Sequence, residues 1–118
     1  MSKAAKSIVV FGIYLVVLGL ALLIVPNALL TLFAYPTTNE VWIRVVGLLV
    51  LVLGYYYIEA ARNELRVMFE ASVRARPALI VFFTILVALG HARPVLVLFG
   101  AIDLLAAIWT ALALRSSD

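Results

Sequence analysis

The chain has 118 residues, of which 67% are hydrophobic and only 13% are charged. A water-soluble domain of this size needs far more polar surface, so the composition excludes a soluble globular protein and indicates a membrane protein. The sequence contains no cysteine, which excludes disulfides, thiolate catalysis and cysteine metal sites, and its single histidine argues against a histidine metal site. The net charge is +3, but the basic residues flank apolar runs and form no stripe on a soluble face, so we expect no nucleic-acid binding.

Four apolar runs fill most of the chain, at about residues 8–25, 41–58, 78–92 and 95–114. Crossing the hydrocarbon as a helix takes about 20 apolar residues. Three runs come close to that length, whereas the apolar stretch of the third spans only about 20 Å. The pattern predicts an all-α fold: an integral membrane four-helix bundle that forms one domain over residues 1–118. Lys3 and Lys6 precede the first run as in a signal peptide, but Pro26 follows it and no small-residue cleavage site does, so we expect an uncleaved span.

The distribution of lysine and arginine predicts the orientation, because these residues mark the cytoplasmic side of a membrane protein. With the N-terminus inside, the outer ends hold two basic residues, Arg44 and Arg93. The inner segments then hold seven, namely Lys3, Lys6, Arg62, Arg66, Arg74, Arg76 and Arg115. We therefore predict that both termini are cytoplasmic (N-in/C-in), and we place Glu40, His91 and Arg93 at the outer rim.

Two segments outside the runs have a predicted structure of their own. Residues 27–35 (NALLTLFAY) are too apolar for a solvated loop, and Thr37 with Glu40 matches a capping box that starts the second helix. Residues 59–76 (EAARNELRVMFEASVRAR) place apolar side chains at helical spacing, which predicts an amphipathic cytoplasmic helix between the second and third spans. Its membrane-surface arginines are Arg62, Arg66, Arg74 and Arg76. We expect them to meet anionic headgroups; docking of a partner and a solvated linker are the alternatives.

Small residues recur on one face of three predicted helices. The sets are Gly12 with Gly19, Gly47 with Gly54, and Gly100 with Ala107 and Ala111. Seven residues make two helical turns, and small residues on one face let helix backbones approach closely in lipid. Packing within the chain is the main interpretation, and a seam for self-association is the alternative.

Asp103 is the residue that most suggests chemistry, because it lies near the middle of the fourth run. A carboxylate at that depth costs roughly several kcal/mol unless it is paired or protonated. It follows Gly100 by three residues, so we expect it to point into the bundle. Arg44 precedes Gly47 by three residues, on the glycine face of the second helix, and is the expected partner.

Three interpretations of Asp103 and Arg44 remain open. They form a structural ion pair that locks the second helix to the fourth; or Arg44 reaches the headgroups while Asp103 is protonated or bonded to another polar group; or the pair handles a ligand or a proton. The candidate bonding partners and cavity-lining residues are Tyr14, Thr84, Trp109 and Thr110. No nucleophile–base pair, metal cluster or phosphate loop is present, so we expect neither an enzyme nor a bound cofactor.

Two stretches carry a resemblance to a known group. NEVWIRVVGLLVLVLGYYYIEAARNELR (39–66) and VLFGAIDLLAAIWTALALR (97–115) resemble small, generally uncharacterised bacterial four-helix membrane proteins that are DoxX-like in layout. The resemblance implies a compact four-helix bundle in the bacterial inner membrane. Relatives in the wider group are linked with redox and oxidative-stress partners or with chaperone-like roles, but this chain has no cysteine for a thiol role.

The sequence therefore favours a non-enzymatic accessory or interaction subunit that packs in the bilayer against a membrane protein partner or against copies of itself. One alternative is a binder or carrier of a hydrophobic small molecule, such as a lipid or quinone, held by Asp103 and Arg44. Another is a small oligomeric transporter or channel with Asp103 on its pathway.

Overall fold

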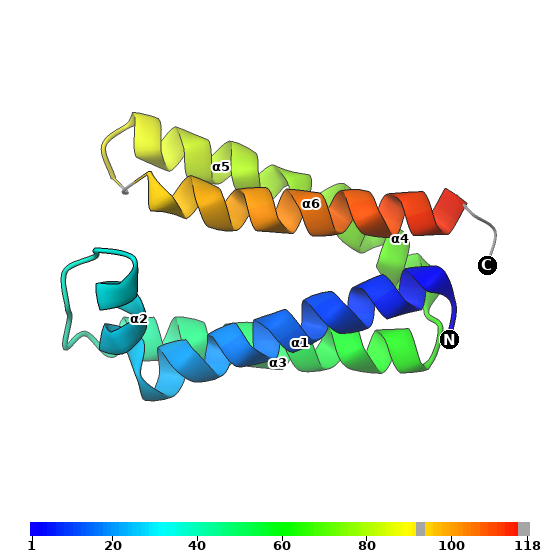
Figure 1. Ribbon diagram of the computed structural model, residues 1–118, viewed down its shortest axis with the longest axis horizontal. Coiled ribbons are helices and arrows are strands. Elements are labelled where there is room, and N and C mark those ends of the chain that lie inside the picture. The colour runs from blue at the N-terminus through cyan, green and yellow to red at the C-terminus, as the bar shows by residue number, and fades with distance from the viewer. Residues whose placement is uncertain (92–93, 116–118) are drawn as a thin grey trace. The chain divides into compact units, whose positions relative to one another are not determined.

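The computed structural model describes residues 1–91 and 94–115, and within them all regular secondary structure is helical (Figure 1). The helices are α1 (Lys3–Ile24), α2 (Pro26–Leu32), α3 (Trp42–Arg62), α4 (Arg66–Ala75), α5 (Pro77–Ala88) and α6 (Val95–Arg115). Residue 92, the last of the predicted third span, and Arg93 lie outside the described residues.

Four helical segments are long and apolar enough to cross a membrane: Lys3–Ile24, Trp42–Arg62, Arg66–Ala88 and Val95–Arg115. This confirms the predicted all-helical class with four candidate spans and defines a multi-pass membrane protein. The orientation of the termini stays a prediction.

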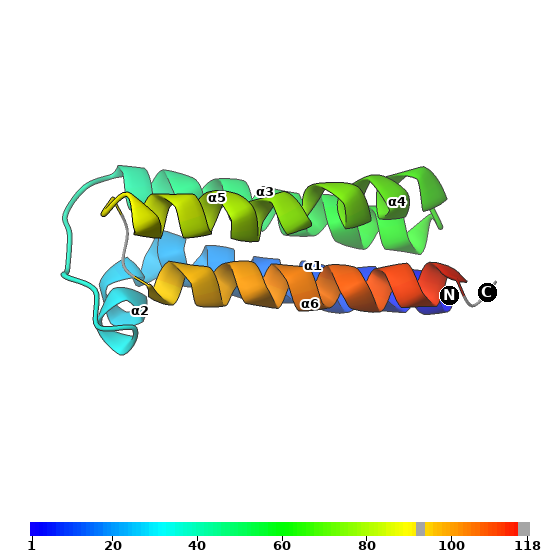
Figure 2. The ribbon, with the colours of Figure 1, turned by 90° about the horizontal axis from the view of Figure 1, so that it is seen from above.

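The third candidate span is longer than the sequence suggested, because α4 and α5 follow each other with only Arg76 between them. Arg76 has helical dihedral angles, with φ at −62° and ψ at −37°, and its N–H donates to the Ser72 carbonyl at 3.0 Å. Pro77 has no N–H and cannot continue the ladder to the carbonyl four residues earlier, so the helix is interrupted at this point. Figure 2 shows the two helices along one path. Arg66–Ala88 has 23 residues and can extend about 34 Å.

The chain divides into two compact units. One contains Val9–Glu59, and the other joins Met1–Ile8 to Ala60–Asp118. The first two turns of α1 thus belong with α4, α5 and α6, whereas the rest of α1 belongs with α2 and most of α3.

In the unit of Val9–Glu59, α1 and α3 touch backbone to backbone through their glycines. A Cβ atom added to Gly19 would lie 2.7 Å from the Gly47 carbonyl oxygen, and one added to Gly54 would lie 2.8 Å from that of Gly12. Each glycine of one helix thus faces a glycine of the other. Only hydrogen fits at these positions, because real Cβ atoms do not approach other atoms that closely.

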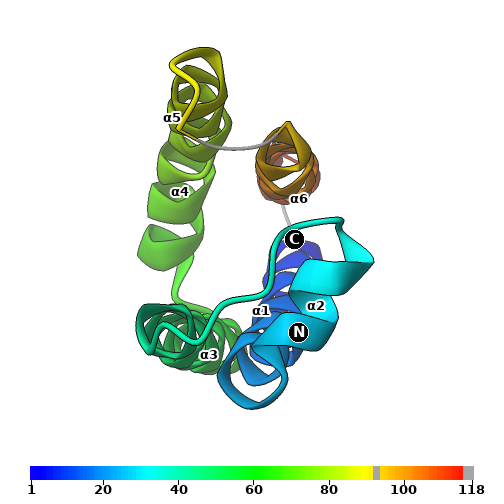
Figure 3. The ribbon, with the colours of Figure 1, turned by 90° about the vertical axis from the view of Figure 1, so that its left-hand side faces the viewer.

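The segment between α1 and α3 folds back on itself at one end of the unit of Val9–Glu59, and Figure 3 shows this segment facing the viewer. Pro26 occupies the first turn of α2, where its missing N–H costs nothing. The Asn27 side chain accepts the Thr38 N–H at 2.8 Å, and the Glu40 N–H donates to the Thr38 hydroxyl. The predicted capping box of Thr37 and Glu40 is therefore wrong, and α3 begins two residues after Glu40.

In the other unit, α5 and α6 are antiparallel neighbours joined by a short turn that includes Gly90. The contact is close at Gly100, where an added Cβ would lie 2.9 Å from the Ile80 Cα. This places Gly100 of α6 directly against α5.

Candidate functional site

A buried polar cluster joins three helices in the unit that contains α4, α5 and α6. Its members are Ser7 on α1, Ser72 on α4, Arg76 at the α4–α5 junction and Thr110 on α6, and each side chain is at most 3% exposed. The Thr110 hydroxyl lies 2.7 Å from the Ser7 hydroxyl and accepts a hydrogen bond from Arg76 Nη2 at 3.2 Å. Thr110 is therefore the point where α1, the α4–α5 junction and α6 meet.

The hydrogen bonds of Thr110 and Ser7 run in one direction, whereas the buried Ser72 hydroxyl has no partner among residues 1–91 and 94–115. Arg76 can only donate, so Thr110 accepts from it and gives its own proton elsewhere. Thr110 has two acceptors in reach, Ser7 and the Ala106 carbonyl at 3.1 Å, and Ser7 has the Ala4 carbonyl at 2.7 Å. The resulting chain of bonds starts at the guanidinium and ends on a backbone carbonyl, so both hydroxyls are satisfied.

Arg76 differs from its predicted place on the membrane surface, because it is buried. Its Nε donates to the Ser72 carbonyl at 3.4 Å, in addition to the bond from Nη2 to Thr110. Burying a guanidinium costs several kcal/mol unless such bonds compensate. Arg62, Arg66 and Arg74, which were predicted to lie on the surface with it, are exposed.

Asp103 is half-buried on α6, two turns before Thr110 and on the same helix face. Among the described residues, no hydrogen bond or ion pair reaches its carboxylate. The charge of Arg76 acts on it from within the same unit. The intramembrane carboxylate and the buried cluster therefore share one stripe of α6.

Arg44, the expected partner of Asp103, is exposed and lies in the unit of Val9–Glu59. Its Nη1 donates to the carbonyl of Leu23 at 2.5 Å and to that of Ile24 at 3.4 Å. These are the last carbonyls of α1, where a helix carries partial negative charge. Arg44 thus closes the C-terminal end of α1, and the pair with Asp103, which would join the two units, stays a prediction.

The other predicted lining residues are in different surroundings. Tyr14 is half-buried and packs against Phe11, with ring centroids 5.8 Å apart. Thr84 is exposed, and its hydroxyl donates to the Ile80 carbonyl of its own helix at 2.7 Å. Trp109 is 46% exposed, while its neighbour Thr110 is fully buried. Of this set, only Thr110 belongs to the buried cluster.

Residues 1–91 and 94–115 hold no group of three His, Asp or Glu side chains placed to bind a metal ion. Comparison of the chain with family models, curated proteins and solved structures finds no match. The role of the candidate site is therefore inferred from the contacts and burial of its own residues.

Sequence reasoning missed Ser7, Ser72 and the structural role of Arg76. One signal was available: Arg76 stands directly before a proline in the middle of a stretch that is apolar enough to span a membrane. A polar side chain at a helix interruption is well placed to serve freed backbone groups and neighbouring helices.

Proposed function

We propose that this chain is a non-enzymatic accessory or interaction subunit in a bacterial inner membrane, DoxX-like in layout, with both termini cytoplasmic. One observation carries the proposal: four polar side chains in or next to the candidate spans, Thr110, Arg76, Arg44 and Thr84, are bonded to the chain itself. Thr110 and Arg76 join helices, Arg44 closes α1, and Thr84 bonds to its own helix. Groups used in this way hold an architecture and are not available to a substrate.

The surface available to a partner is apolar. Leu49 on α3, Phe82 on α5 and Leu105 on α6 are 64%, 62% and 67% exposed. In lipid, such faces contact either acyl chains or another membrane helix. Another helix is favoured where its side chains pack closely against the face. An accessory role predicts that one of these faces is covered by the same protein whenever the chain is in its native membrane.

Site-specific photocrosslinking tests this. A photoreactive amino acid is placed at Leu49, Phe82 or Leu105 in the full chain, with buried Phe69 as the control position, and the membranes are irradiated before solubilisation. The expected result is one crosslinked species of fixed mass from one helix face, identified by mass spectrometry, and none from the other faces. Crosslinks to lipid alone from all three positions would contradict the proposal.

A second candidate, a binder of a hydrophobic molecule with a polar head, is favoured by Asp103. Its carboxylate is half-buried and accepts no hydrogen bond within the described part of the chain. Native mass spectrometry of the lipid-retaining protein tests this candidate. A bound mass of a few hundred daltons that is lost in Asp103→Asn, with helix content unchanged, would favour it, whereas a proton flux that needs Asp103 would indicate the oligomeric transporter instead.

A further inference from the structure

The hydroxyl of Ser72 differs from those of three other helical residues. Ser7, Thr84 and Thr110 each have a backbone carbonyl of their own helix, three or four residues earlier, within hydrogen-bond distance. The Ser72 hydroxyl makes no hydrogen bond with any residue among 1–91 and 94–115, although Ser72 is only 3% exposed. A buried polar group normally has a partner, because its removal from water is otherwise not compensated.

The guanidinium of Arg76 lies close to this hydroxyl. Its Nε lies 3.4 Å from the Ser72 carbonyl oxygen, and its Nη2 lies 3.2 Å from the Thr110 hydroxyl. Side chains tilt toward the N-terminus of their helix, so Arg76 runs back along α4 toward the turn that contains Ser72. The guanidinium thus bonds to the backbone of Ser72 and stops short of its hydroxyl. A guanidinium has five N–H groups, so it can donate to a further acceptor while it keeps both bonds.

One antiparallel register relates α6 to the helical path of α4 and α5. Arg66 Nη2 donates to the Leu114 carbonyl at 3.3 Å, and Gly100 packs against the Ile80 Cα. These two contacts are equally far apart along α6 and along the α4–α5 path, so the same register holds at both. A residue of α4 therefore lies level with the α6 residue that is as far from Leu114 as it is from Arg66.

In this register Ser72 lies level with Ile108, in the turn of α6 that runs from Ala107 to Thr110. Ala107 is 2% exposed and lies on the same side of α6 as Thr110, the residue that Arg76 contacts. Only the hydrogen of glycine is a smaller side chain than the methyl group of Ala107, so this position leaves room opposite Ser72. A site for a small polar molecule needs both polar partners and space.

The burial of the surroundings limits the size of that molecule. Ser72 and Arg76 are each 3% exposed, and Phe69, one turn before Ser72 on the same face of α4, is 2% exposed. A lipid headgroup therefore cannot reach the hydroxyl, whereas a water molecule inside the protein can. Water also matches the bonds required, because it accepts from a guanidinium and donates to a hydroxyl oxygen.

We propose that an internal water molecule binds between the Ser72 hydroxyl and the Arg76 guanidinium, inside the candidate span Arg66–Ala88. Its oxygen accepts an N–H of Arg76, and one of its hydrogens is donated to Ser72 Oγ. The water solvates the positive charge at the helix interruption, which lowers the cost of keeping Arg76 charged in an apolar segment.

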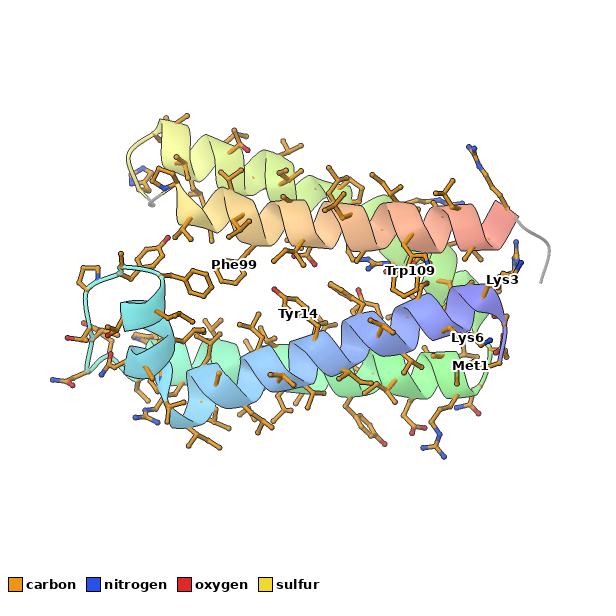
Figure 4. All side chains as sticks on the ribbon, in the orientation of Figure 1. Met1, Lys3, Lys6, Tyr14, Phe99 and Trp109 are labelled. Atoms are coloured by element: carbon orange, nitrogen blue, oxygen red, sulfur yellow. The ribbon has the colours of Figure 1, made fainter. Side chains whose placement is uncertain are left out.

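Solid-state NMR of the full, isotope-labelled chain in lipid bilayers tests the site through the transfer of magnetisation from water protons to carbon. The control is Ser7, a buried serine whose hydroxyl has partners. Figure 4 shows Lys6, the residue before Ser7, on the first turns of α1. We expect the Ser72 Cβ to receive magnetisation at shorter mixing times than the Ser7 Cβ and the Phe69 ring. Equal transfer to Ser72 and to either control would overturn the assignment, and this comparison needs no variant.

Two alanine variants locate the water. An internal water needs at least two polar partners, so early transfer to the Arg76 Cζ should be lost in Ser72→Ala. Ser7→Ala is the matched control and should retain it, because the bond between Arg76 and Thr110 stays in place. Retention in both variants, or loss in both, would overturn the assignment.

The stability of Ser72→Ala gives an independent test, measured by reversible unfolding in mixed micelles. Loss of the bond to water lowers the folded-to-unfolded ratio about fivefold, and the higher helix propensity of alanine recovers about twofold of it. We therefore expect a net loss of roughly two- to threefold. A hydroxyl without any partner would destabilise the fold by itself, and its removal would raise the ratio by about tenfold. A rise in the ratio would overturn the proposal.

Discussion

The glycine contacts between α1 and α3 give a prediction whose size follows from the distances. In Gly19→Ala, the new Cβ would lie 2.5 Å from the Leu51 nitrogen, 2.7 Å from the Gly47 oxygen and 2.8 Å from the Leu51 Cα. Carbon atoms pack best at about 3.5–4.0 Å, so the helices must separate by roughly 1 Å, which forfeits about a quarter to a half of each neighbouring dispersion contact. All three obstructing atoms are backbone, so no side-chain rotation relieves the clash.

Two effects of opposite sign set the magnitude. Alanine is a better helix former than glycine by about 1 kcal/mol, which would stabilise the variant if space were available. Overpacking costs about 1–3 kcal/mol, and a clash of backbone against backbone lies at the upper end of that range. We therefore expect Gly19→Ala to lower the free energy of unfolding by about 2 kcal/mol, which is roughly a thirtyfold loss in the folded-to-unfolded ratio.

Reversible unfolding in mixed micelles, followed by circular dichroism, measures this change. Gly12→Ala is the comparison variant, because its new Cβ would meet one backbone atom, the Gly54 oxygen at 3.0 Å, and otherwise the side chains of Ile58 and Tyr57 at 2.8 and 3.3 Å. We expect it to lose less stability than Gly19→Ala, because side chains shift more easily than backbone. If Gly19→Ala were as stable as the unmodified chain, or less affected than Gly12→Ala, the inference of backbone contact would be refuted.

Three further predictions concern polar groups. Thr110→Val removes the acceptor of Arg76 and should destabilise the chain by about 2 kcal/mol in the same unfolding assay, whereas Thr110→Ser should cost less than half of that; equal costs would show that the hydroxyl does not matter. Hydrogen bonds from Ser2, whose N–H donates to Glu64 Oε2 at 3.1 Å, hold the pKa of Glu64 below its usual value. This bond therefore stabilises the fold above the ordinary value of 4.5 and is lost as the pH falls through the lower folded value, so protection of the Ser2 amide from hydrogen exchange should fall with acid. Glu64→Gln should remove that pH dependence, and an unchanged profile would exclude Glu64 as its source. A double-mutant cycle of Arg44→Gln with Asp103→Asn tests the predicted ion pair, which requires a coupling energy of at least about 1 kcal/mol; additivity within about 0.5 kcal/mol would show that Arg44 serves only the end of α1.

The general fold could be predicted because the bilayer imposes a length on every span. Runs of about 20 apolar residues are read directly from the chain, and three of the four candidate spans lie where the runs are. The spacing of seven between Gly12 and Gly19 likewise predicts a shared helix face from local geometry alone. Both inferences use distances along one helix, which a sequence states without ambiguity.

The third span and the buried cluster could not be predicted in the same way, because they depend on contacts between distant segments. Ser7 and Thr110 are 103 residues apart, and Arg76 and Thr110 are 34 apart. A polar side chain of an amphipathic pattern is normally assigned to the solvated face, so Arg76 was placed at the membrane surface. Pro77 lies in the first turn of α5, the commonest place for a proline in a helix, but the helical Arg76 before it extends the helical path back to Arg66.

The pairing of Gly12 with Gly54 and of Gly19 with Gly47 limits how copies of this chain can associate. Each helix of the pair already covers the glycine face of the other, so these faces are closed to a second molecule. Any homo-oligomer must therefore be built from surfaces with full-sized side chains, such as the one that contains Leu105, where interlocking shapes replace the close approach of backbones. Small-to-large substitutions at the glycines would then disrupt the protomer itself, and substitutions that change only the oligomeric state would be found elsewhere.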